Sequence, residues 1–372
     1  VGQGNTSDAI DAFERVAAAE PAHTEVHLRL AGLYDGVDDD AALAAYERVI
    51  KLAPDNASPY FLLGAIHLRL GAKQSVIDVY TAGLLLQPRR APEQYALAQL
   101  LDESDDLAGA ASHYAVAVEL KEDEPAWQYN YARCAHRLAA RTEGYDERMQ
   151  LYIAADHAYT ASILLEPKAP AHFHRGMLRR AHRQIGESLY LYSEVAFDFE
   201  QVIAGDPENG EAWYALGLTY VDMEQDSKAR RTFRRLLAIH PTYENAHTEL
   251  GAISERQQEY QQAISDYAAE VSAHPDSAHA HYRLGYLYQA SRDDLGTASE
   301  HLARAVELDR TNADAHVEYG RVLYRLDRLR AAADQFEHAL KLDPRNLTAN
   351  FNLAMVYQYL DKRALAAERF RY

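Results

Sequence analysis

Cysteine, proline and long apolar segments are scarce in this sequence, and each scarcity excludes a class of protein. No apolar run approaches the roughly 18 to 20 residues that a membrane-spanning helix needs. The one cysteine, Cys134, cannot form an internal disulfide, and without a second thiol we expect no structural zinc or iron–sulfur site. Only 12 prolines and 18 glycines interrupt 372 residues that are 48% hydrophobic, so we expect a folded, largely helical chain.

Positive charge is also in short supply. The 38 basic residues, only seven of them Lys, face 56 acidic ones, and the net charge is −18. A protein that neutralises nucleic-acid phosphates needs a basic face, so this balance argues against nucleic acid and against anionic membranes as partners. The sequence does not fix the compartment, and an assembly in the bacterial cytoplasm or cell envelope is consistent with it.

Motifs for nucleotide, phosphate or nucleophile chemistry are missing as well. The sequence has no Gly-rich dinucleotide fingerprint, no P-loop, no His-Glu-x-x-His and no Gly-x-Ser-x-Gly. The 17 His residues include the pairs His172/His174 and His279/His281, but residues two apart on a helix point about 200° away from each other. Neither pair can therefore grip one metal ion, and we predict a non-enzyme without cofactor or metal.

What the sequence does contain is a repeat. One 34-residue unit carries, in order, Trp213, Leu216, Gly217, Tyr220, Ala229, Phe233 and Pro241. The closing proline recurs at 34-residue steps from Pro54 to Pro88 and from Pro207 through Pro241 to Pro275. Within each unit the apolar residues recur at helical spacing in two blocks, which is the pattern of two amphipathic helices. The Pro then stops the second helix, because it lacks an N–H and disfavours helix in the residue before it.

Small and large residues alternate between the two helices of each unit. The first helix carries Gly or Ala where the helices must approach closely, and the second carries Tyr or Phe to fill the space, as Gly217 and Phe233 show. In this Trp-Leu-Gly-Tyr then Ala-Phe-Ala-Pro pattern the sequence resembles the tetratricopeptide repeat family over essentially its entire length. The resemblance implies an all-α fold, a right-handed superhelical solenoid of antiparallel helix pairs. His247, His281 and His316 stand in the position of Trp213, where we expect a half-buried aromatic ring.

We predict a single solenoid over residues 1–372. It consists of partial repeats at 1–23 and 347–372 and full repeats at 24–56, 57–90, 91–124, 125–169, 170–209, 210–243, 244–277, 278–312 and 313–346. The repeat 125–169 has about eleven extra residues near 139–150, and 170–209 has about six near 183–193; such insertions map to loops or lengthened helices. A solenoid end without a polar cap exposes its stacking face, so we infer an excerpt of a longer chain or an end covered by a partner.

The exposed positions of the first helices provide the main candidate site. The resemblance implies that partners bind in a concave groove formed by these helices. Towards the C-terminus these positions hold Tyr214, Tyr282, Tyr286, Arg321, Tyr324, Arg325, Phe351 and Tyr359. Tyr and Arg are enriched at binding hot spots, so we predict that this set contacts a partner. Because the chain has 26 Tyr residues, partial packing between neighbouring first helices is the alternative.

A second candidate site is a basic cluster within the acidic chain. It consists of Arg133, Arg137, Arg175, Arg179, Arg180 and Arg183 in the two irregular repeats. Such a cluster can grip an acidic partner segment, including one from a second copy. The alternative is a solvated surface.

The function that these observations favour is a protein–protein interaction scaffold. It would hold an extended or helical segment of one or more partner proteins in its groove within a larger assembly. Two alternatives remain open at this stage. One is the substrate-recognition arm of a larger enzyme, as in glycosyltransferases with similar repeats, although their Asn ladder is absent. The other is self-assembly through stacked ends.

Overall fold

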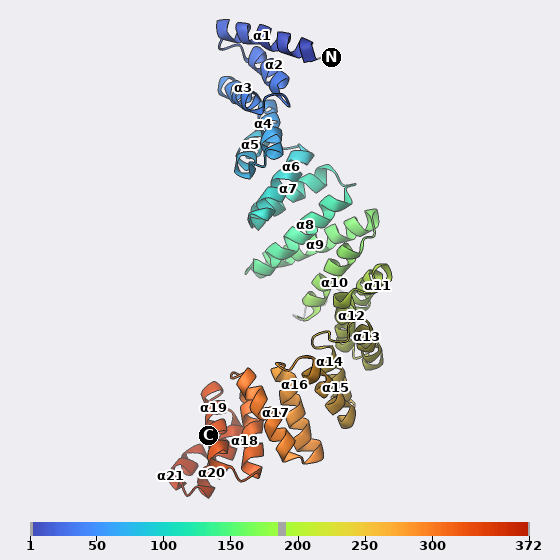
Figure 1. Cartoon of the computed structure of the whole chain (residues 1–372), viewed down its shortest axis with the longest axis vertical. Helices are drawn as coiled ribbons and strands as arrows, with labels where there is room; N and C mark the ends of the chain where they lie inside the picture. The colour runs from blue at the N-terminus through green and yellow to red at the C-terminus, as the bar shows by residue number, and fades with distance from the viewer. Residues whose placement is uncertain (1–2, 185–190, 371–372) are drawn as a thin grey trace. The chain divides into compact units, whose positions relative to one another are not determined.

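The computed structural model describes residues 3–184 and 191–370 (Figure 1). Over these ranges the chain forms helices and turns without any β-strand, which confirms the predicted all-α class. No helix found there is both long and apolar enough to cross a membrane. The chain divides into two compact units, Val1–Val202 and Ile203–Tyr372, and each is described by itself.

The first unit, unit 1, begins with a single helix and continues as helix pairs. Its helices are α1 (Gln3–Ala19), α2 (Thr24–Tyr34), α3 (Asp39–Leu52), α4 (Ser58–Arg69), α5 (Lys73–Leu86), α6 (Ala91–Glu103), α7 (Leu107–Leu120), α8 (Pro125–Arg141), α9 (Tyr145–Leu165), α10 (Ala169–Gln184) and α11 (Tyr192–Gly205). The pairs α2/α3, α4/α5, α6/α7 and α8/α9 pack most closely, and each second helix also contacts the next first helix. Each helix from α2 to α9 therefore lies between its chain neighbours.

The second unit, unit 2, repeats this arrangement. It contains α12 (Gly210–Asp222), α13 (Asp226–Ile239), α14 (Ala246–Arg256), α15 (Tyr260–Ala273), α16 (Ala278–Leu287), the π-helical turn η1 (Tyr288–Arg292), α17 (Leu295–Leu308), α18 (Ala313–Arg325), α19 (Leu329–Leu342), α20 (Leu347–Tyr359) and α21 (Arg363–Arg369). The pairs α12/α13, α14/α15, α16/α17, α18/α19 and α20/α21 each fall within one predicted repeat. The prediction of a single array over the whole chain remains a prediction.

A left-handed residue closes the first helix of most pairs. Positive φ angles occur at Gly71, Asp105, Glu224, Gln258, Asp293, Asp327 and Asp361. At Asp105, the N–H of Asp106 donates to the carbonyl of Leu101 at 2.9 Å, which is the six-to-one bond of a Schellman cap. The Asp106 carboxylate then accepts from the Gly109 N–H at 3.0 Å and caps α7. One short segment thus ends one helix and starts the next.

One repeat is a residue longer than its neighbours, and the extra residue lies in η1. The left-handed positions Glu224 and Gln258 are 34 residues apart, as are Asp293 and Asp327, but Gln258 and Asp293 are 35 apart. The chain accommodates the added residue by widening the last turn of the first helix into η1. Single π-turns of this kind are frequent at functional sites.

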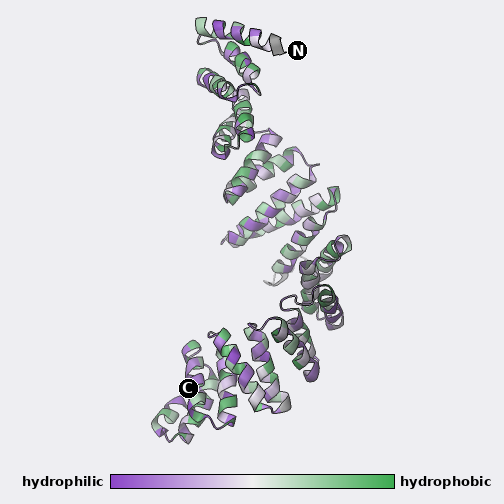
Figure 2. Cartoon of the chain, in the orientation of Figure 1, coloured by the Kyte–Doolittle hydropathy of each residue, from purple (hydrophilic) through white to green (hydrophobic). Residues whose placement is uncertain are grey.

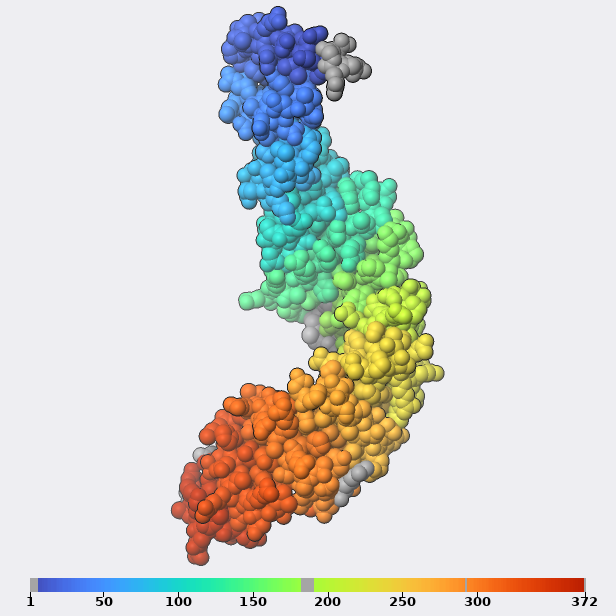
Figure 3. All heavy atoms as spheres, viewed as in Figure 1, coloured from blue at the N-terminus to red at the C-terminus, as the bar shows by residue number. Residues whose placement is uncertain are grey.

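Close packing within several pairs depends on a glycine opposite an aromatic ring. A Cβ added to Gly217 in α12 would lie 2.5 Å from the Phe233 ring of α13, which is fully buried. Gly320 and Phe336 repeat this contact at 2.6 Å. Apolar and polar residues alternate around each helix, as Figure 2 shows. The apolar sides are buried between neighbouring helices. Figure 3 shows the outer surface of the side chains in the same view.

The position of Trp213 is defined by a hydrogen bond as well as by an aromatic ring. The indole N–H of Trp213 donates to the Pro207 carbonyl, six residues earlier, at 2.9 Å. The same six-residue contact recurs with several side-chain types, at His27, Tyr60, Gln94, Gln128, His281, His316 and Asn350. In these repeats the side chain ties the start of the first helix to the turn before it, so a polar N–H or O–H group is favoured there. His247 stands in the same position, but its Nδ1 has no hydrogen-bond partner in the described ranges.

The insertion predicted near 139–150 lengthens helices rather than forming a long loop. Helix α8 has 17 residues and α9 has 21, whereas α3, α5 and α7 have 14 each. The insertion predicted near 183–193 lies largely outside the described residues.

Candidate functional site

The first helices of unit 2 carry an aromatic and cationic face around Arg283 of α16. Its guanidinium carbon lies 5.7 Å from the ring centre of Tyr282 and 5.2 Å from that of Tyr286. Arg283 Nε donates to Glu255 of α14 at 2.9 Å, and the same carboxylate accepts from Tyr267 at 2.8 Å. These contacts hold Arg283 against both rings, so two of the predicted tyrosines belong to one rigid surface.

Next to this surface lies a hollow of about 580 Å³ between α16, η1 and α18. Three residues of the predicted set line it, namely Tyr286, Arg321 and Arg325. Arg321 pairs with Glu318 at 2.9 Å, and Arg325 pairs with Asp293 at the left-handed turn. Both arginines are exposed, and ion pairs at such exposure are worth at most about 1 kcal/mol, so a ligand can exchange them at little cost.

A buried amide also lines the hollow. Gln289 in η1 is only 7% exposed, and its amide nitrogen faces Glu318 at 3.5 Å. Its carbonyl oxygen is buried and has no hydrogen-bond donor within the described ranges. A buried acceptor without a donor costs free energy, so this residue is a local cost to stability beneath the hollow.

The predicted residues further along form a second aromatic group. The rings of Tyr324 in α18 and Tyr359 in α20 are 5.8 Å apart, and a hydrogen bond between their hydroxyls raises the pKa of Tyr324. Phe351 packs edge-on against Phe370 at 6.0 Å but stays 58% exposed. Tyr359 is also largely exposed, at 64%. Both remain available for contact.

Tyr214 is separate from these groups. It lies in α12 with its ring 5.8 Å from Phe233 and 5.4 Å from Tyr243, and it is half-buried. These contacts are with the second helix of its own pair and with the turn that follows it, not with a neighbouring first helix. A role of Tyr214 in binding stays a prediction.

Two members of the predicted basic cluster are part of the interior of unit 1. Asp198 of α11 is completely buried and accepts from Arg175 at 2.6 and 3.0 Å and from Arg179 at 3.5 Å. Arg179 also donates to Asp156 at 2.6 Å, and His172 faces Asp198 at 3.0 Å. Because these guanidinium groups are paired with buried carboxylates, the prediction that Arg175 and Arg179 bind a partner is replaced by a structural role in the interior.

The other members of the cluster differ in exposure. Arg133 and Arg137 of α8 pair with Asp102, and Arg137 also reaches Asp105 at 3.0 Å, yet both side chains are about 40% exposed. Arg180 is half-buried on α10, and the side chain of Arg183 lies outside the described part. A role in binding stays a prediction for these four.

Metal binding and nucleophilic thiol chemistry depend on how the His, Cys, Asp and Glu side chains are placed in the described part. No group of three or more His, Cys, Asp or Glu residues within it could hold a metal ion. Cys134 is fully buried, and burial raises the pKa of its thiol to about 12, so the nucleophilic thiolate is not formed at neutral pH.

Sequence reasoning missed Arg283, Gln289 and Asp293 as parts of the site. Only the 35-residue length of the repeat 278–312 could have drawn attention to this region, because an added residue must be accommodated somewhere in the helix pair.

The fold defines a class of protein built from repeated helix hairpins, and family models make the assignment specific. A TPR repeat model matches residues 33–71, and tetratricopeptide repeat models match 1–35 and 248–313, 192–252, and 313–346. The chain belongs to the tetratricopeptide repeat family, as its sequence pattern predicted. Protein binding is typical of this family, whose members are generally non-catalytic scaffolds.

Solved structures of the same class are similar at low identity, and no curated protein matches the sequence. YrrB, a TPR protein with an unusual peptide-binding site, is 21% identical over 47% of this chain and 89% of its own, with a TM-score of 0.43. Yeast Tom70 is 13% identical over 99% and 88%, with a TM-score of 0.43. A tetratricopeptide repeat protein from Parabacteroides merdae is 16% identical over 72% and 98%, with a TM-score of 0.47.

Proposed function

We propose that this protein is a non-catalytic scaffold that holds partner proteins in a larger assembly, and that unit 2 binds a partner segment on its first helices. The observation that carries this proposal is the hollow lined by Tyr286, Arg321 and Arg325, next to the Tyr282–Arg283 surface. Tyr and Arg provide most of the energy at many interfaces, because they combine a large contact area with hydrogen-bond donors.

The chemistry of the hollow indicates the kind of segment that fits. Arg321 and Arg325 offer guanidinium groups to an acidic side chain, while the ring of Tyr286 offers a flat apolar contact. A partner segment with an acidic residue beside an apolar one, bound in extended or helical form, satisfies both kinds of group.

The test is affinity capture from an extract of the organism that encodes the protein, with a paired variant and a matched control. The variant is Tyr286→Ala with Arg325→Ala. The control is Tyr260→Ala with Arg231→Ala, which removes one exposed Tyr and one exposed Arg from the second helices α15 and α13. Arg325, Tyr260 and Arg231 are exposed, so the loss of each should shift the free energy of unfolding by only about 0.5 kcal/mol. Tyr286 is half-buried and packs against the core of α15 and α16, so circular dichroism must show that the variant stays folded.

We expect a partner that co-purifies in stoichiometric amount with the unmodified protein and with the control, and that is lost from the variant. Equal recovery of this partner by all three proteins would refute binding at the hollow.

A further inference from the structure

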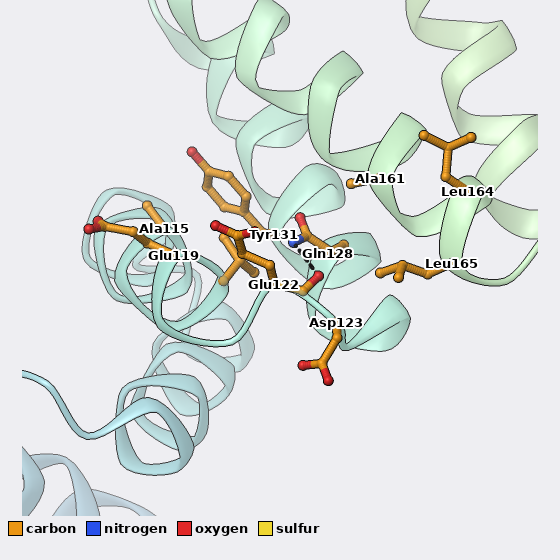
Figure 4. A pocket seen from close by; sticks show the side chains of 10 residues that line it. Ala115, Glu119, Glu122, Asp123, Gln128, Tyr131, Ala161, Leu164 and Leu165 are labelled. Carbon is orange, nitrogen blue, oxygen red and sulfur yellow. Dashed lines mark hydrogen bonds between the residues drawn. The ribbon is translucent and has the colours of Figure 1, made fainter.

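The second helices of unit 1 form a groove that is separate from the first-helix face. It lies between α7 and α9, with the start of α8 as its floor, and has a volume of about 680 Å³ (Figure 4). We call it the α7–α9 groove. Helices α7 and α9 are second helices of successive repeats and are separated by α8, so the space between them is open to solvent.

One wall of the α7–α9 groove is apolar and unusually exposed. Leu164 and Leu165 at the end of α9 are 81% and 44% exposed, and Tyr131 and Val118 line the groove opposite them. Figure 4 shows Leu164 and Leu165 on the α9 side and Tyr131 across the gap. Two adjacent leucines left in water at a groove of this size are typical of a surface that a partner covers.

The opposite rim is acidic. Glu119 on α7 and Glu122 and Asp123 in the following turn line the α7–α9 groove, and all three are exposed. None of them forms an ion pair with another residue of the described ranges. The lysine next in sequence, Lys121, pairs with Glu124 instead and lies 5.3 Å from the Trp127 ring centre. Asp123 also lies close enough to Lys121 to help Glu124 raise the pKa of that lysine, whereas Glu119 and Glu122 have no ion-pair partner in the described ranges. The acidic rim therefore faces a leucine pair.

We propose that the α7–α9 groove binds an amphipathic partner segment that carries Lys or Arg beside its apolar side chains. The apolar side chains cover Leu164 and Leu165, and the cations lie along Glu119, Glu122 and Asp123. The net charge of −18 supports this choice of partner, because the field of the whole chain attracts a cationic segment and repels a second copy. This surface is independent of the hollow in unit 2.

The chain contains a matched control for this proposal. Leu85 and Leu86 end α5 as Leu164 and Leu165 end α9, and they are exposed to the same extent, at 83% and 41%. The charge on the neighbouring second helix is opposite, since Lys51 occupies the last-but-one position of α3 and Glu119 the same position of α7. The residue three beyond each leucine pair, Arg89 or Lys168, is basic in both cases. A cationic ligand should therefore discriminate between two leucine pairs of equal exposure.

The experiment measures binding of a synthetic peptide to the full chain by fluorescence anisotropy. The probe is a labelled 16-residue helical peptide with Leu at positions i, i+3, i+4 and i+7 and Lys on the flanks, and a second peptide replaces each Lys by Glu. We expect the Lys peptide to bind about tenfold more weakly to Leu164→Ser with Leu165→Ser, and equally well to Leu85→Ser with Leu86→Ser. Tyr286→Ala with Arg325→Ala should also leave peptide binding unchanged, which separates this test from that of the hollow.

Charge reversal provides the second arm of the experiment. Glu119→Lys with Glu122→Lys and Asp123→Lys should abolish the preference for the Lys peptide and allow the Glu peptide to bind. Two results would overturn the proposal and indicate general attraction to an acidic protein. In one, the two leucine variants weaken binding of the Lys peptide equally. In the other, Leu164→Ser with Leu165→Ser binds this peptide as well as the unmodified chain does. Circular dichroism checks that each variant stays folded.

Discussion

Replacement of Asp198 by Asn tests whether the arginines of α10 serve the fold or a partner. Asp198 is completely buried and is the common acceptor for Arg175 and Arg179. The introduced amide keeps the shape of the carboxylate but loses the negative charge, and its NH2 group cannot accept from a guanidinium. The substitution therefore leaves Arg175, which is 9% exposed, as an uncompensated buried cation.

The magnitude follows from this burial. Removing one partner of a buried ion pair costs about 3–5 kcal/mol, because the remaining charge keeps its desolvation penalty. For a unit of roughly 200 residues, each kcal/mol shifts the melting temperature by about 2–4 °C, so Asp198→Asn should lower the transition of unit 1 by roughly 6–20 °C.

The assay is thermal unfolding of the full chain followed by circular dichroism, with Asp105→Asn as the matched control. Asp105 pairs with Arg137 and Arg141, but its side chain is 57% exposed, so this substitution should cost less than about 1 kcal/mol. If Asp198→Asn shifts the transition no further than Asp105→Asn does, the assignment of Arg175 and Arg179 to the interior is refuted.

Three further substitutions test the packing, the turns and the histidines of unit 2. Gly217→Ala places a methyl group against a buried ring and should lower the free energy of unfolding by about 1–3 kcal/mol, measured by urea denaturation. Gly296→Ala is the control, because the nearest atom to its added methyl group is 3.6 Å away, and it should be neutral or stabilising. Gln258→Gly relieves a left-handed backbone at φ 60° and should stabilise by about 0.5–1 kcal/mol; a loss of stability in the same assay would contradict the role of this turn. The Nδ1 atoms of His281 and His301 lie 3.0 Å apart, and burial first of all lowers the pKa of both from 6.5. Around and below pH 6.5 the unfolded chain therefore binds more protons than the folded chain, so stability should be complete above that pH and fall on acidification. His301→Gln should reduce the fall in melting temperature between about pH 7.5 and 5.5.

The helix pairs could be predicted from the sequence because their signals are local. Two blocks of apolar residues at helical spacing, a small residue opposite a large one, and in most repeats a closing proline indicate the hairpins without reference to distant segments. Gly217 and Phe233 show this most directly, since the residue types alone indicate a close approach that the structure places at 2.5 Å for an added Cβ.

The candidate site was only partly predictable, because it depends on contacts between repeats. The sequence identified exposed tyrosines and arginines, but it did not indicate that Arg175 would meet a buried Asp198 while Arg321 and Arg325 would line a hollow. The sequence predicted that His281 replaces Trp213 as an aromatic ring, but it did not indicate the hydrogen bond that the two positions share. Trp213 donates to the carbonyl of Pro207, and Nε2 of His281 faces the carbonyl of Pro275, in each case six residues earlier.

The central claim, that partners bind the first-helix face of unit 2, is tested most directly by photo-crosslinking. A benzoylphenylalanine replaces Tyr286 in one protein and Tyr260, which is exposed on the second helix α15, in another. After irradiation in the native extract, the account predicts a covalent adduct with a partner protein from position 286 and none from position 260. Adducts of equal yield from both positions, or from position 260 alone, would contradict it.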